Sequence, residues 1–91
     1  MERSEVRKKI IEFADNNVGF DESQSDEQKE QQRIVADLGG DSLDMLEIVM
    51  DTEREFGITI TNEEGDKLFA DDPTIGELVD FTMKKISEQA E

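Results

Sequence analysis

The chain has 91 residues, of which 25 are acidic and 10 basic, so its formal net charge is −15. This length fits one small domain without a deep preformed cavity. The acidity argues against nucleic acid and membranes as partners, and either gives solubility alone or favours basic patches on other proteins. Because the sequence has no His and no Cys, it lacks the usual general base, the usual soft metal ligands and any disulfide. We expect no His-dependent or Cys-dependent catalytic residues and no metal site.

The first predicted helix runs from about Ser4 to Asn17, with Ser4 as its cap. Its apolar residues fall at helical spacing: Val6, Ile10, Ile11, Phe13 and Ala14. Phe20, just after this helix, is expected to fold back onto the core. The charged start of the chain, residues 1–9, has no apolar segment behind it, so we expect no signal peptide. No stretch reaches transmembrane length, and a cytoplasmic protein is the default expectation.

Residues 21–33 contain Asp, Glu, Ser, Gln, Lys and Arg but no apolar side chain. This composition predicts a long, solvated and mobile loop between the first two long helices. The alternative is a short helix over Asp26–Gln32, since Glu, Gln and Lys favour helices. Such a helix would have no apolar face to bury and would be marginal alone.

Ile34, Val35 and Leu38 are predicted to return the chain to the core before the Gly39-Gly40 turn. A second helix then begins at Asp41 or Ser42 and runs to about residue 56, where Gly57 ends it. Its apolar residues cover more of the circumference than one buried stripe needs. Some of them should therefore reach solvent or a partner.

The rest of the chain predicts a short connector with Ile58 and Ile60, a short helix over 63–69, and a final helix. Thr74 and Glu77 have capping-box spacing at the start of that last helix. Lys84 and Lys85 are expected near its C-terminus, where the helix dipole favours cations.

Together these elements predict an all-α fold, a small four-helix bundle with three longer helices and one short helix. We expect one domain over residues 1–91 with a polar loop insertion at about 21–33. The predicted interior consists of Val6, Ile10, Ile11, Phe20, Leu38, Val49, Phe56, Ile60, Leu68, Ile75, Leu78, Val79 and Ile86.

The stretch Asp37-Leu38-Gly39-Gly40-Asp41-Ser42-Leu43-Asp44, leading into an amphipathic helix, resembles the modification site of acyl carrier proteins. The resemblance extends from Ile34 to about Ile86. It implies that Ser42, flanked by Asp41 and Leu43, receives 4′-phosphopantetheine from coenzyme A through a magnesium-dependent transferase. It also implies a non-catalytic protein that carries acyl groups as thioesters on this arm.

The placement of Ser42 agrees with this implication on physical grounds. A serine at the start of a helix exposes its hydroxyl, and a phosphodiester there gains from the positive end of the helix dipole. Gly39 and Gly40 are expected to remove side-chain bulk from the approach. The alternative is that Ser42 simply caps the helix.

The second helix also carries the expected partner face. The resemblance implies that partner enzymes contact its carboxylates through Arg and Lys. The expected contact residues, together with Leu43, are Asp44, Leu46, Glu47, Met50, Asp51 and Glu53. The carboxylates could instead form an ordinary solvated helix face, and the apolar residues could belong to the core.

Four departures from the family pattern suggest a specialised carrier with its own pathway: the long polar loop, Gly40, Thr52 and Arg54. We expect a monomer that serves acyl-transferring or acyl-modifying enzymes of fatty-acid, lipid or polyketide-type synthesis. A lipidic cargo should slip between the helices. The alternatives are a peptidyl or aminoacyl carrier and, in a different class, an unmodified acidic interaction module.

Overall fold

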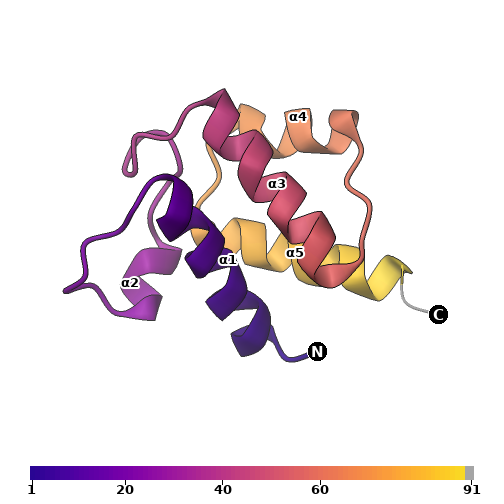
Figure 1. Ribbon diagram of the computed structural model, residues 1–91, viewed down its shortest axis with the longest axis horizontal. Helices are drawn as coiled ribbons and strands as arrows, with labels where there is room; N and C mark the ends of the chain where they lie inside the picture. The colour runs from indigo at the N-terminus through magenta and orange to yellow at the C-terminus, as the bar shows by residue number, and fades with distance from the viewer. Residues whose placement is uncertain (90–91) are drawn as a thin grey trace.

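The computed structural model describes residues 1–89 and is built from helices joined by loops. The helices are α1 (Arg3–Asn17), α2 (Asp26–Glu30), α3 (Ser42–Phe56), α4 (Asn62–Ala70) and α5 (Ile75–Gln89). Figure 1 shows α1, α3 and α5 as the long elements, with α2 at the lower left and α4 along the top. The predicted all-α bundle is confirmed, with one short helix more than expected. Within the described residues, no helix has the length and apolarity needed to cross a membrane.

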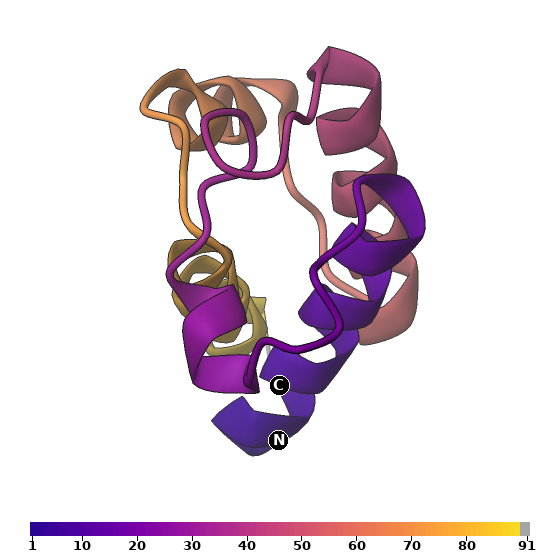
Figure 2. The same ribbon diagram turned by 90° about the vertical axis from the view of Figure 1, so that its left-hand side faces the viewer.

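The core lies where α1 packs against both α3 and α5 (Figure 2). Seven of the predicted interior residues are buried: Val6, Ile10, Ile11, Ile60, Ile75, Leu78 and Val79. The other six are partly buried: Phe20, Leu38, Val49, Phe56, Leu68 and Ile86. The apolar periodicity therefore identified the buried faces of α1 and α5 correctly.

Two details of the predicted core are wrong. In α3 the fully buried aliphatic side chain is Ile48, at 2% exposure, whereas its neighbour Val49 is only partly buried. In the loop before α3, Ile34 is completely buried but Val35 is 43% exposed. In each pair the two residues point in different directions, and their apolar character alone does not distinguish them.

The helix starts match the predicted capping residues in all but one case. Thr74 and Glu77 form the expected reciprocal bonds at α5, in which Thr74 N–H donates to Glu77 Oε1 at 3.0 Å and Glu77 N–H donates to Thr74 Oγ1 at 3.1 Å. At α1 the cap position is Glu2, which makes no side-chain capping bond. Ser4 lies inside the helix, so its prediction as the cap is wrong.

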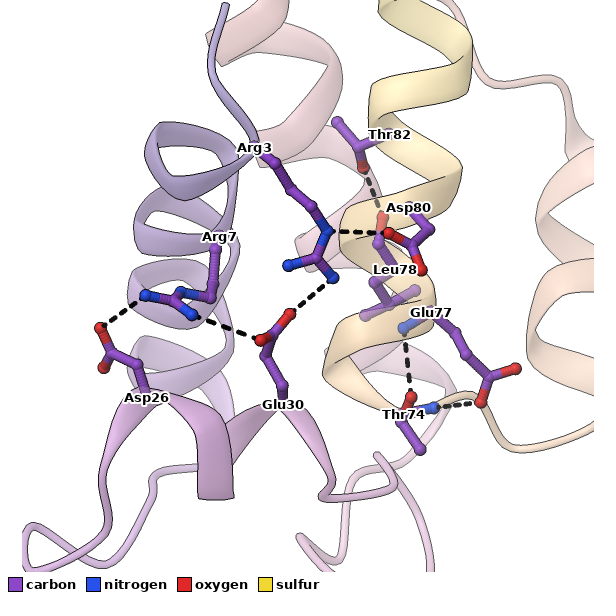
Figure 3. A network of polar contacts seen from close by, with 9 residues as sticks. All are labelled: Arg3, Arg7, Asp26, Glu30, Thr74, Glu77, Leu78, Asp80 and Thr82. Carbon is purple, nitrogen blue, oxygen red and sulfur yellow. Dashed lines mark hydrogen bonds and ion pairs between the residues drawn. The ribbon is translucent and has the colours of Figure 1, made fainter.

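The segment 21–33 is only partly a loop, because residues 26–30 form α2 with a capping box between Ser25 and Gln28. Helix α2 buries no apolar side chain and is held by charge (Figure 3). Glu30 Oε1 lies 2.7 Å from Arg3 Nη2 of α1, and Glu30 Oε2 accepts a hydrogen bond from Arg7 Nη1 at 3.4 Å. These ion pairs explain how a helix without an apolar face finds a fixed place.

The expected role of Lys84 and Lys85 at the end of the last helix is wrong, because α5 continues to Gln89. Lys85 is instead buried, and its Nζ lies 2.6 Å from Glu64 Oε2 of α4. The hydrogen bond from Lys85 lowers the pKa of Glu64 to about 2. This ion pair fastens α4, which buries no side chain of its own, to α5.

Candidate functional site

Ser42 is the first residue of α3, and its side chain is exposed. The cap is the preceding residue: Asp44 N–H donates to Asp41 Oδ1 at 3.0 Å, and Asp41 N–H donates to Asp44 Oδ2 at 3.0 Å. The bond from the Asp44 amide lowers the pKa of the Asp41 carboxyl. The alternative in which Ser42 caps the helix is therefore wrong, and its hydroxyl is available for other chemistry.

The two glycines before the site act differently from each other. Gly39 has a φ of +71°, a left-handed conformation that favours glycine. Gly40 is buried, and a Cβ there would lie 2.8 Å from Ile34 Cγ2 and 3.1 Å from Val18 Cγ1. Gly40 is thus needed for packing between the loop and the end of α1. The expectation that it clears the approach to Ser42 is wrong.

The loop before the site is fastened to the connector between α4 and α5. Asp72 Oδ1 and Oδ2 accept from the Val35 and Ala36 N–H groups at 2.7 and 2.9 Å. Arg33 Nη1 donates to the Asp72 carbonyl at 2.5 Å, and Ile34 N–H donates to the Pro73 carbonyl at 3.1 Å. The sequence predicted no role for Asp72. Its positive φ of 50° marks it in the structure as a residue with a special role.

An open groove of about 700 Å³ lies between α3 and α4 and begins at Ser42. Its walls include Met45, Leu46, Val49 and Met50 from α3 and Gly65 and Phe69 from α4. The contribution of α4 was not expected, because helical periodicity does not tell which short helix faces the serine. Ser42 therefore lies beside a largely apolar groove.

The predicted apolar contact residues are exposed, at 61% for Leu43, 53% for Leu46 and 47% for Met50. The alternative in which these apolar residues belong to the core is therefore wrong. Glu47, on the same part of α3, is also exposed. A small acidic-and-apolar surface therefore surrounds the start of the groove.

The remaining predicted carboxylates do not all join this surface. Glu53 lines the groove, where its Oε2 accepts from the Ile60 N–H at 3.0 Å. Asp51 is half-buried and lies 3.6 Å from Arg54 Nη1, beside a separate hollow that Phe13 also lines. A helix turns about 100° per residue, so carboxylates two residues apart fall on different sides of α3.

The residues present fit a phosphate ester on Ser42. The hydroxyl is exposed at the N-terminus of a 15-residue helix, where backbone N–H groups and the dipole favour an anion. The adjoining groove offers apolar surface for a chain attached there. Neither Asp41 nor Asp44 covers the serine, since their carboxylates are directed to each other's backbone.

Comparison with known proteins agrees with this geometry. Residues 25–82 match the family described as "Phosphopantetheine attachment site". The "Acyl carrier protein" of Thermotoga maritima is 34% identical over 92% of this chain and 95% of its own length. The "Acyl carrier protein" of Rubrobacter xylanophilus is 36% identical over the same shares. That of Chlorobium luteolum is 31% identical over 93% of this chain and all of its own length.

Proposed function

Because this chain belongs to the acyl carrier protein family, which carries covalent 4′-phosphopantetheine and is not catalytic, we propose that Ser42 is its attachment residue. The observation that carries the proposal is that Ser42, the first residue of α3, is exposed and does not cap the helix, because Asp41 is the cap. The groove that begins at Ser42 supports it further.

In this function the residues of the chain hold the phosphopantetheine arm and present its cargo to partner enzymes. The arm supplies the thiol that binds the acyl group as a thioester. The N-terminus of α3 stabilises the phosphodiester by about 0.3–1 kcal/mol at an exposed position. The groove shelters apolar cargo from water. The contacts of residues 33–36 with Asp72 and Pro73 hold the loop before Ser42 against the connector between α4 and α5.

The partners we propose are a phosphopantetheinyl transferase and acyl-transferring or acyl-modifying enzymes with basic docking patches. The net charge of −15 steers such patches towards the chain. We assign the contact to the α3 docking surface, formed by Leu43, Leu46, Glu47 and Met50, whose side chains are exposed. Asp44, Asp51 and Glu53 flank it and contribute mainly through their charge.

We further propose that residues 1–91 act as one carrier domain and as a monomer. The cargo is an acyl intermediate of fatty-acid, lipid or polyketide-type synthesis, and the chain serves a dedicated pathway. A peptidyl or aminoacyl cargo is the second candidate, favoured by the Gly40-Asp41-Ser42-Leu43 context. Mass spectrometry of the carrier isolated from its native cells distinguishes the two by the mass of the bound group.

The attachment itself is tested by incubating the chain with coenzyme A, magnesium and a promiscuous phosphopantetheinyl transferase. We expect the mass to rise by one phosphopantetheine, and Ser42→Ala to abolish the gain. Ser4→Ala is the matched control, since Ser4 is also exposed in the first turn of a long helix. A well-folded wild type that gains no mass, or a modified Ser42→Ala, refutes the assignment.

A further inference from the structure

Two threonine hydroxyls lie inside the helix bundle. Thr52 of α3 is 3% exposed and Thr82 of α5 is 2% exposed. Each Oγ1 donates its hydrogen to the carbonyl one helical turn earlier, Thr52 to Ile48 at 2.7 Å and Thr82 to Leu78 at 2.8 Å. Since a hydroxyl has one hydrogen and two lone pairs, both oxygens keep their accepting capacity. Among residues 1–89, no donor bonds to either oxygen.

The two threonines line the same interior crevice, which has a volume of about 10 Å³ between α1, α3, α4 and α5. The other walls are apolar and include Ile10, Leu68 and Phe81. The crevice therefore combines a hydrocarbon lining with two hydrogen-bond acceptors from facing helices. Two valines of the same shape would fill this space without polar atoms.

The crevice lies next to the groove that begins at Ser42. Val49, Ile60 and Phe69 line both hollows, so these three side chains form the shared boundary. Thr52 is ten residues after Ser42 in the same helix, which places it about 15 Å along the axis of α3. Helix α4, which forms the other wall of the groove, has no fully buried side chain, and its Leu68 and Phe69 are only partly buried, so it can move more easily than α1, α3 or α5.

We propose that Thr52 and Thr82 select a cargo whose acyl chain carries a hydroxyl group. This inference rests on the proposed function, because it takes the chain attached at Ser42 as the occupant of the crevice. A hydroxyl on the cargo donates its hydrogen to a threonine oxygen and thereby keeps the hydrogen bond it loses on leaving water. A plain hydrocarbon leaves both acceptors unpaired, and a keto oxygen meets another acceptor.

The test is a thermodynamic cycle with the intact acylated carrier. Wild type and Thr52→Val are loaded at Ser42 with saturated acyl chains of increasing length. A second set has one hydroxyl moved along the chain, and a third has a keto group at the same positions. Urea unfolding then gives the folded-to-unfolded ratio of each form, and the cycle isolates the coupling between the threonine and the cargo hydroxyl.

At the matching position, we expect the cargo hydroxyl to raise the ratio about fivefold more in wild type than in Thr52→Val. Thr82→Val gives a second, independent cycle and replaces the first if Thr52→Val does not fold. The control is Thr59→Val, at an exposed threonine outside the crevice, where no coupling is expected. The keto series should show no coupling.

Equal responses of wild type and both variants to the hydroxyl, at every position and length, would overturn the inference and leave the threonines as ordinary core residues. Mass spectrometry precedes each unfolding experiment. Failure to load the wild type at Ser42 refutes the proposed function, whereas loading without coupling refutes only the selection of hydroxylated cargo.

Discussion

A substitution at Gly40 tests how tightly the loop before Ser42 is packed against the rest of the bundle. A methyl group there would lie 2.8 Å from Ile34 Cγ2, 3.1 Å from the Ile34 carbonyl oxygen and 3.1 Å from Val18 Cγ1. Ile34 is completely buried, so its side chain has no open space to move into. The Ile34 carbonyl oxygen is a backbone atom and also accepts a hydrogen bond from the Gly40 N–H at 2.8 Å, so it cannot move aside easily.

Gly40→Ala therefore overpacks the junction between the loop and the end of α1. Overpacking of this kind costs about 1–3 kcal/mol of the free energy of unfolding. In a domain of this size, each kcal/mol corresponds to about 4–8 °C in melting temperature. The measurement is urea unfolding followed by circular dichroism, repeated as a thermal melt.

The matched control is Gly65→Ala in α4, where a Cβ would meet nothing within 4 Å. Alanine favours a helix over glycine, so this variant should be more stable than wild type by about 0.5–1 kcal/mol. The two identical substitutions thus have opposite expected signs. A Gly40→Ala variant as stable as wild type would show that the contacts around Ile34 do not constrain the loop.

Three further predictions follow from polar contacts. Asp41→Ala should lower the melting temperature by about 4–8 °C, because Asp41 caps α3. Ser42→Ala, which removes no cap, should change it by no more than about 2 °C. Equal losses of the two variants in differential scanning calorimetry would contradict this prediction. Lys85 lowers the pKa of Glu64 to about 2, so the ionised Glu64 should make wild type more stable than Glu64→Gln. This difference in stability should be complete above about pH 4.5 and should disappear as the pH falls towards 2. A difference between their melting temperatures that does not depend on pH would refute the prediction. Glu30→Gln should speed amide hydrogen exchange in α2 relative to α5, and unchanged exchange in α2 would show that its ion pairs with α1 do not hold it.

Much of the site was determined by local sequence. The start of α3, its end at Gly57 and the capping box at Thr74 follow from residue types that satisfy backbone groups within a few positions. The apolar periodicity of α1 and α5 identified their buried faces for the same reason, because one helix face repeats every 3.6 residues. The exposed Ser42 was therefore predictable from its neighbours alone.

The tertiary structure decided everything that depends on which distant segments meet. Lys85 and Glu64 are 21 residues apart, and Asp72 reaches back to the amides of residues 35 and 36. Helix α2 is fixed in position by ion pairs with α1 that no local pattern contains. Local rules describe the bonds a residue makes within one or two turns, whereas packing brings together side chains whose separation in sequence carries no signal. The groove beside Ser42 and the threonine-lined crevice behind it are consequences of that packing.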